Sequence, residues 1–165
     1  MANALRLKNN NYINSDSIVH DRKLLSNILR NEYHKKEKRI NVNGWYRIAR
    51  ISDNQINLLL SINTLWFYNP PSSVYFSILT IYQNAKISQL NALTFPNSTP
   101  SITKLRVQYD NTTRYYYVDV YYTPNSANQI SVKCENRNDL DSIEILEPTI
   151  PLIEYTTVDE ITITY

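Results

Sequence analysis

The chain has 165 residues, with 17 Lys and Arg against 15 Asp and Glu, so its formal net charge is only +2. Nucleic-acid-binding proteins usually carry a clustered basic excess, and this balance argues against that class. With 42% hydrophobic and 19% charged residues, the chain is predicted to be globular, with one core and a short appendage.

Fourteen tyrosines and a single glycine constrain the local structure. Tyrosine favours β-strands, and turns must be built mainly from Asn, Asp, Ser and Pro. The single cysteine excludes an intrachain disulfide, and two histidines at no ligand spacing argue against a zinc site. We expect no metal and no other cofactor. Cys134 shares a predicted strand face with Ile130 and Val132, which indicates a buried, inert thiol.

Residues 1–39 are predicted to form a segment separate from the rest of the chain. Leu5, Leu7, Tyr12 and Ile13 alternate weakly with polar residues, which predicts a short extended piece. Residues 32–39 carry interleaved charges of both signs. This pattern predicts a solvated linker or a continued exposed helix, with a specific anion site as the alternative.

Residues 22–30 are predicted to form a short helix that Asp21 can cap. Its apolar stripe consists of Leu24, Leu25 and Ile28, which are our candidate attachment residues. A helix this short is marginally stable alone. We therefore expect the stripe to pack on a sister chain or on a partner protein.

The segment 40–165 is predicted to be mainly β, with about nine short strands and no long helix between them. Residues 73–82 form the longest strand candidate, with Val74, Phe76, Ile78 and Tyr82 on one face. The other face carries Tyr75, Leu79 and Ile81, which suggests that both faces of this strand are covered. The spacing of the short strands indicates an antiparallel sandwich, jelly roll or barrel. Of these, the fold class predicted is an antiparallel, jelly-roll-like β-sandwich with a short N-terminal extended or helical segment. The strands expected are 45–51, 55–62, 73–82, the two arms of 102–122, 130–134, 143–146, 150–155 and 161–165. Residues 86–95 are expected to form a short strand or an irregular packed segment.

Residues 102–122 are predicted to form the central hairpin. Leu105, Val107 and Tyr109 alternate with polar residues, and the chain turns at 110–113. In the second arm, the core face is predicted to hold Tyr116, Val118, Val120 and Tyr122. The opposite face holds Tyr115, Tyr117 and Tyr121 beside Asp119, and it is too aromatic to be simply solvated.

Two groups of aromatic residues are candidates for ligand or subunit contact. Trp66, Phe67 and Tyr68 lie on a loop that a proline pair closes, and the second group is Tyr115, Tyr117 and Tyr121, called here the tyrosine row. Aromatic side chains stack on sugar rings and anchor interfaces. The alternative for both groups is burial against another layer or a sister subunit, and for the tyrosine row we favour that alternative.

Membrane insertion and catalysis are not expected. No apolar run approaches the ~20 residues that span a bilayer, and the N-terminus lacks the apolar core of a secretory signal. The carboxylates of the β-region are scattered, with no obvious glycosidase pair or calcium loop. We expect a protein that is made in a cytoplasm without classical export and that is not an enzyme.

Several short stretches resemble tail or head fibre proteins of bacteriophages that infect gut bacteria. Residues 5–13 and 17–26 are similar to the N-terminal segment of that group, although Asn10 stands where the pattern often has Gly. The stretches similar to its C-terminal domain are 44–49, 85–90, 102–107 and 115–122. The resemblance implies a homotrimeric fibre protein with a β-sandwich head, attached to the virion by its N-terminus. It implies no catalytic residues.

The sequence therefore predicts a phage virion fibre protein with two parts. Residues 1–39 would attach to other virion proteins or trimerise, and residues 40–165 would form a head that contacts a glycan or protein of the host surface. The first alternative is a purely structural capsid or tail decoration protein. The second is a carbohydrate-active enzyme.

Overall fold

The computed structural model describes residues 5–6, 12–13, 35–52, 56–65, 71–123, 128–135, 140–146 and 154–165. The chain divides into two compact units, Met1–Tyr33 and His34–Tyr165. In the first unit, β1 (Leu5–Arg6) and β2 (Tyr12–Ile13) pair antiparallel, with Leu5 opposite Ile13, which confirms the extended piece predicted there.

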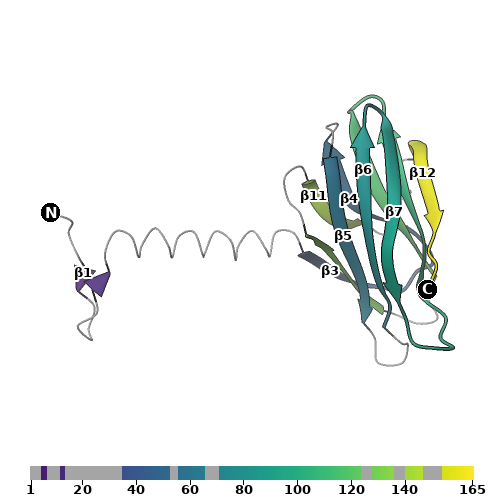
Figure 1. Cartoon of the computed structure of the whole chain (residues 1–165), viewed down its shortest axis with the longest axis horizontal. Helices are drawn as coiled ribbons and strands as arrows, with labels where there is room; N and C mark the ends of the chain where they lie inside the picture. Colours follow the sequence, from purple (N-terminus) through teal and green to yellow (C-terminus); the bar gives the residue numbers. More distant parts are fainter. Residues whose placement is uncertain are drawn as a thin grey trace. The chain divides into compact units, whose positions relative to one another are not determined.

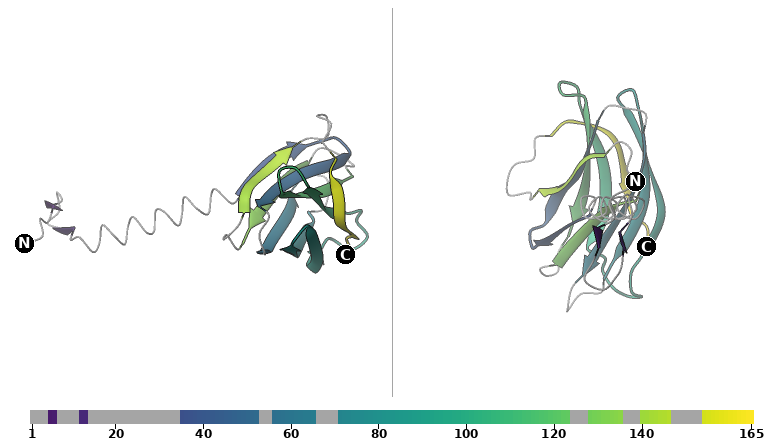
Figure 2. Two further views of the ribbon diagram at one scale, coloured as in Figure 1. Left: turned by 90° about the horizontal axis from the view of Figure 1, so that it is seen from above. Right: turned by 90° about the vertical axis from the view of Figure 1, so that its left-hand side faces the viewer.

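The second unit is an antiparallel β-sandwich, as predicted, with two five-stranded sheets (Figures 1 and 2). One sheet, called the β6 sheet, has the order β3-β10-β5-β6-β7; the other, called the β9 sheet, has the order β11-β4-β9-β8-β12. The strands of the β6 sheet are β3 (Lys35–Ile40), β5 (Ile56–Leu65), β6 (Ser73–Ile81), β7 (Asn84–Leu93) and β10 (Asn128–Cys134). Those of the β9 sheet are β4 (Gly44–Ser52), β8 (Ile102–Asp110), β9 (Tyr115–Tyr122), β11 (Leu140–Leu146) and β12 (Thr156–Thr162).

The core lies between the sheets and takes alternate residues of each inner strand. The predicted inward row of β9 is confirmed: Tyr116, Val118, Val120 and Tyr122 are fully buried. Tyrosine rings also pair within this core, because the Tyr46 and Tyr122 rings meet edge to face at 5.9 Å. The Tyr46 hydroxyl donates to the Val42 carbonyl at 2.7 Å, so this deep ring keeps a polar partner. Cys134 is a buried thiol, as predicted.

The central hairpin is confirmed, with Val107 opposite Val118 and Tyr109 opposite Tyr116. Its turn is built by a carboxylate instead of a glycine. Asp110 accepts hydrogen bonds from the Thr112 backbone at 2.8 Å and the Thr113 hydroxyl at 2.5 Å. These bonds, the Thr113 hydroxyl foremost, hold the pKa of Asp110 below its usual value.

The prediction of a linker or helix at 32–39 is wrong for residues 35–39, which belong to β3. β3 pairs with β10, from Asn128 opposite Ile40 to Lys133 opposite Lys35. It is an edge strand from which only Ile40 is buried in the core. Charged side chains on an edge strand discourage pairing with other chains. The sequence pattern therefore did not predict this strand, because the usual alternation of apolar and polar residues is missing from its mixed charges.

Three further predictions require correction. The last strand is Thr156–Thr162 and not 161–165, although Ile163 still donates to the Thr103 carbonyl at 2.9 Å. The strand starts early because Thr156 and Thr157 pair with Tyr109 and Gln108 of β8. Of the predicted strand 150–155, residues 154 and 155 are not in a strand, and the rest lie outside the described residues. Tyr82, expected on the core face, is exposed in the turn after β6.

Side chains link the two sheets along the edge where β7 and β12 lie. The Asp159 carboxylate of β12 accepts the backbone N–H of Ile87 in β7 at 2.7 Å. The side chain of Gln89 pairs with the backbone of Thr164, accepting its N–H at 3.0 Å and donating to its carbonyl at 2.5 Å. These bonds satisfy backbone groups that an edge strand would otherwise expose.

The two-residue turn between β6 and β7 carries backbone strain. Ile81 pairs with Asn84, and the two residues between them have positive φ, 40° at Tyr82 and 65° at Gln83. Such turns favour Asn and Gly, because a side chain with a Cβ meets steric repulsion in this region. Here the bulky residues Tyr82 and Gln83 occupy the two central positions of the turn instead.

We expect Gln83→Gly to stabilise the protein by about 0.5–1 kcal/mol, since it relieves this repulsion at a modest cost in unfolded-state entropy. Urea unfolding of the full chain measures the effect. Asn97→Gly is the matched control, because Asn97 also has positive φ, 61°, but asparagine tolerates that region. A gain no larger for Gln83→Gly than for Asn97→Gly would contradict the assignment of strain.

Candidate functional site

The tyrosine row lies on the outer face of the β9 sheet, and each of its rings is half-buried. The Arg47 guanidinium carbon is 4.3 Å from the centre of the Tyr117 ring, and that ring stacks on Tyr155 at 4.9 Å. Tyr121 meets Trp45 edge to face at 5.2 Å. The rings therefore already pack against side chains of their own chain. Contact of the row with a sister subunit or a ligand remains a prediction.

A buried charge network lies beside the tyrosine row. Asp119 of β9 has no exposed surface, and its carboxylate accepts the Nε of Arg47 at 2.9 Å and the Nε of Arg106 at 3.1 Å. Arg47 lies on β4 and Arg106 on β8, the two neighbours of β9. The register places both arginines directly opposite Asp119, so one carboxylate joins the three central strands of this sheet.

The network continues to the segment before β12. Arg47 Nη2 donates to Gln108 Oε1 at 3.1 Å, and Gln108 Nε2 donates to the Tyr155 carbonyl at 3.1 Å. This holds Tyr155 over Tyr117, and burial raises the pKa of Tyr155, with a further contribution from the neighbouring Tyr117 hydroxyl. Arg106 also lies 4.2 Å from the Trp45 ring centre. The arginines are thus shared between a carboxylate and aromatic faces, which suits a structural role.

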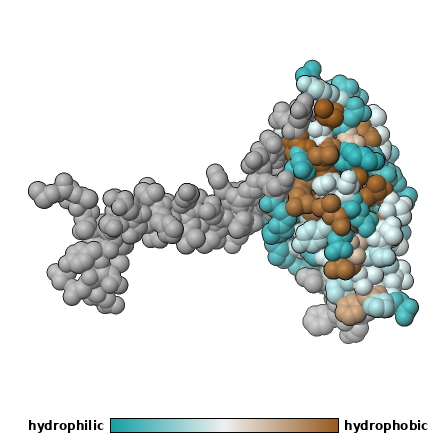
Figure 3. Space-filling view, viewed as in Figure 1, coloured by the Kyte–Doolittle hydropathy of each residue, from teal (hydrophilic) through white to brown (hydrophobic). Residues whose placement is uncertain are grey.

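Large apolar side chains are exposed on the outer face of the other sheet, over β6 and β7 (Figure 3). We call this surface the β6–β7 face; its exposed apolar residues are Tyr75, Leu79, Ile81, Leu90 and Leu93. The prediction that Tyr75, Leu79 and Ile81 face away from the core is confirmed. The second cover expected for them is absent among the described residues of this single chain, since all three are exposed.

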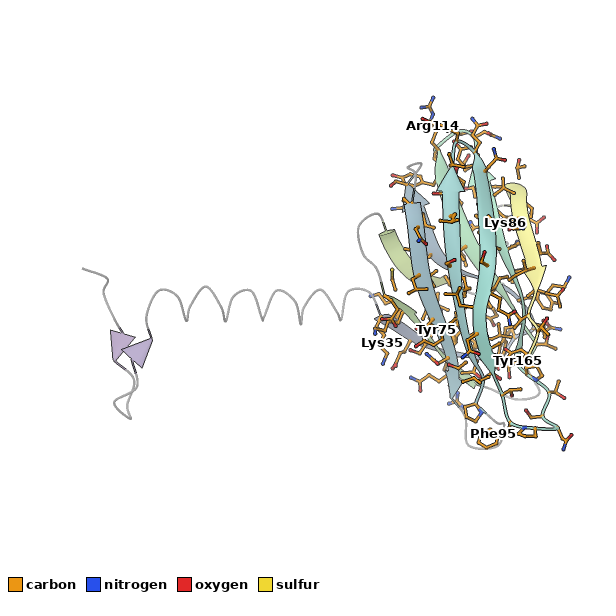
Figure 4. All side chains as sticks on the ribbon, viewed as in Figure 1. Lys35, Tyr75, Lys86, Phe95, Arg114 and Tyr165 are labelled. Carbon is orange, nitrogen blue, oxygen red and sulfur yellow. The ribbon has the colours of Figure 1, made fainter. Side chains whose placement is uncertain are left out.

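An open pocket of about 480 Å³ lies at one end of the β6 sheet, where β5 ends, β6 begins and β7 runs into its following loop. Its lining residues are Asn63, Thr64, Pro71, Ser72, Ser73, Leu93, Thr94, Phe95 and Pro96. Figure 4 places Phe95 at this end of the sandwich and Arg114, in the turn of the central hairpin, at the opposite end. The volume lies within the range of about 300–1,000 Å³ that small-ligand sites occupy.

Hydrogen bonds connect the residues that line the pocket. The Ser72 backbone N–H donates to Thr64 Oγ1 at 2.9 Å, and the Thr64 backbone N–H donates to the Ser72 carbonyl at 2.8 Å. The Thr94 hydroxyl lies 3.5 Å from that of Ser72 and 2.8 Å from that of Ser98. The Ser73 hydroxyl donates to Asn63 Oδ1. The three segments around the pocket are therefore joined before any ligand arrives.

A tight turn positions Phe95 at the rim. The Ser98 backbone N–H and hydroxyl both donate to the Phe95 carbonyl, at 3.2 and 2.6 Å. Pro96 and Asn97 occupy the two central positions, and Asn97 has φ 61°, as a type II turn requires at its second central residue. The Phe95 side chain is 59% exposed, so its ring is available for stacking.

Only some of the candidate residues predicted from the sequence lie within the part of the chain that the structure describes. Trp66, Phe67, Tyr68, Leu24, Leu25 and Ile28 all lie outside the described residues. The sequence did not single out the pocket residues or the arginines of the charge network. A signal existed for the pocket, because Pro71 and Pro96 mark two loops at strand ends. The sequence gives no comparable signal for Arg47 and Arg106, because other polar residues also stand in both of their strands.

Among the described residues, no group of three or more His, Cys, Asp and Glu side chains could hold a metal ion. Within the same part of the chain, no helix has the length and apolarity that crossing a membrane requires.

Comparison with known proteins gives little. No family model and no curated protein matches the chain. A solved structure that resembles it is the tailspike protein of Acinetobacter phage vB_ApiP_P1, with a TM-score of 0.42 and 12% sequence identity. The aligned part covers 70% of this chain and 23% of the tailspike chain. Likeness at this level does not establish a shared fold or function.

We expect Asp119→Asn to destabilise the protein by about 3–5 kcal/mol, because two guanidiniums would lose their buried counter-charge. Glu160→Gln is the matched control. The Glu160 carboxylate pairs with Lys104 at 3.2 Å on an exposed surface, where such a pair contributes about 1 kcal/mol or less. Urea unfolding compares the two variants. Equal losses would show that the network is not the main stabilising contact of this face.

Proposed function

We propose that this chain is a ligand-binding protein, the receptor-binding head of a bacteriophage virion fibre. The observation that carries the proposal is the open pocket at the end of the β6 sheet. It combines an exposed aromatic ring, an apolar wall and fixed hydroxyl groups on a rigid scaffold, which is the usual composition of a small-ligand site.

The lining of the pocket supports binding without bond cleavage. It consists of Ser, Thr, Asn, Pro, Leu and Phe, so it offers no acid, base or activated nucleophile of its own. Glycosidases use a pair of carboxylates around the scissile bond. A carbohydrate-active enzyme is the remaining alternative in this class, and release of reducing sugar from a bound glycan would identify it.

The assignment to a virion rests on the sequence resemblance to phage fibre proteins. In this proposal the N-terminal segment attaches the protein to other virion components. The sandwich then presents the pocket to a glycan or protein on the host surface, and a homotrimer would present several copies together. Several weak sites in one particle can give strong attachment.

We expect the labelled full-length protein to bind cells of a susceptible strain within a panel of gut bacteria. Phe95→Ala should weaken that binding about tenfold, which corresponds to a loss of about 1.4 kcal/mol of stacking free energy. Tyr82→Ala is the matched control, because it removes an exposed aromatic ring at the opposite end of β6. Both variants should keep the circular dichroism of the unaltered protein. Unchanged cell binding by Phe95→Ala would contradict the proposed site.

A second candidate function is that of a structural component of the virion, and the β6–β7 face favours it. This face holds exposed Tyr75, Leu79 and Leu90, and an exposed apolar surface of this kind commonly marks a protein interface. In that case the contact would be with further copies of the chain.

If copies associate through this face, the unaltered protein should sediment as an oligomer and the double variant Leu79→Asp, Leu90→Asp as a monomer. Charges on both strands would have to be desolvated in the interface, which is costly. Sedimentation velocity over a range of concentrations makes the measurement, with Thr162→Asp, an exposed position of β12 in the other sheet, as the control. An oligomer that survives the double substitution would rule out this face as the contact.

A further inference from the structure

We propose that the pocket selects an uncharged sugar residue, a hexose or an N-acetylhexosamine, and discriminates against sugars that carry a carboxylate. This inference rests on the proposed binding function and specifies the class of its ligand. It follows from three properties of the lining, which are its lack of charge, its apolar wall and its fixed polar groups.

The first property is the lack of ionisable side chains. All of the lining residues that the structure describes are neutral at physiological pH. A uronic or sialic acid that entered the pocket would give up part of the hydration of its carboxylate. No arginine or lysine of the lining could pair with that charge in return, and burying an unpaired charge is costly. A neutral sugar avoids this cost.

The second property is the apolar wall. Pro71, Leu93, Phe95 and Pro96 provide it, and Leu93 and Phe95 are both largely exposed at its rim. A pyranose ring has one face of C–H groups and an edge of hydroxyls. The C–H face can stack on the Phe95 ring and bury apolar area there, while the hydroxyls remain directed toward polar partners.

The third property is a set of polar groups held in place. The Thr64 and Ser72 side chains are buried, at 1% and 2% exposure, and support the wall of the pocket. The half-buried Thr94 hydroxyl is held by those of Ser72 and Ser98, so little of its rotamer freedom remains to be lost on binding. Asn63 accepts the Ser73 hydroxyl through Oδ1, which leaves its Nδ2 group to donate to a ligand oxygen. Hydroxyl and amide groups match sugar hydroxyls and an acetamido group without requiring a charge.

The test uses the full-length protein on an array that carries neutral oligosaccharides together with their sialylated or uronic acid counterparts. The best neutral glycan and its acidic counterpart are then compared by isothermal titration calorimetry. We expect the neutral glycan to bind at least tenfold more tightly, and Phe95→Ala to weaken it about tenfold while Tyr82→Ala leaves it unchanged.

A charge-placement variant tests the reason for the selectivity. Leu93→Arg puts a cation at the exposed rim of the pocket, and it should bring the affinity for the acidic glycan to within a few-fold of that for the neutral one. Thr162→Arg is the control, because it adds the same charge at an exposed position of β12 in the other sheet, and it should keep the original preference. Because the Leu93 side chain is 61% exposed and Thr162 is also exposed, both variants are expected to fold.

Two results would overturn the inference. The first is binding of the acidic glycan as tightly as the neutral one by the unaltered protein. The second is neutral glycan binding that Phe95→Ala does not affect. If cells are still bound through Phe95 while no neutral glycan binds, the inference fails and the proposed receptor-binding function stands. Cell binding that is independent of Phe95 counts against both.

Discussion

The carboxylate of Asp119, buried between two guanidiniums, is the interaction on which the architecture of the β9 sheet depends. A carboxylate without exposed surface is costly unless charged hydrogen bonds offset its lost hydration. Arg47 and Arg106 can supply those bonds only if their strands flank β9 in the observed register. The network therefore disfavours a one-residue slip in either neighbour, which would move an arginine to the core face.

This arrangement makes β9 a strand that is covered on both sides. Its inner face holds Val118 in the hydrophobic core, and on its outer face Tyr117 packs against both Arg47 and Tyr155. The β6 sheet is different, because its outer face is largely open and its end carries the pocket. One sheet thus contributes stability through a closed outer face, while the other leaves apolar and polar groups available for contact.

The strand pattern was largely predictable from the sequence, because alternation with period two reports which residues can share a face. The central hairpin, the inward row of β9 and the burial of Cys134 follow from it and are confirmed. β3 escaped prediction because its side chains are charged along an exposed edge, and the pairing that makes it a strand is with β10, far away in the sequence. The early start of β12 was likewise decided by its pairing with β8.

By itself, the sequence determined the fold class, the hairpin and the face of β9 on which each tyrosine lies, because these depend on local alternation and turn chemistry. Only the tertiary structure decided what covers those tyrosines, since Arg47 and Tyr155 reach them from distant segments. The same holds for the pocket, whose walls come from the ends of three strands. Alternation specifies the direction of a side chain but not its neighbours, and neighbours follow from strand order and register across the whole sheet.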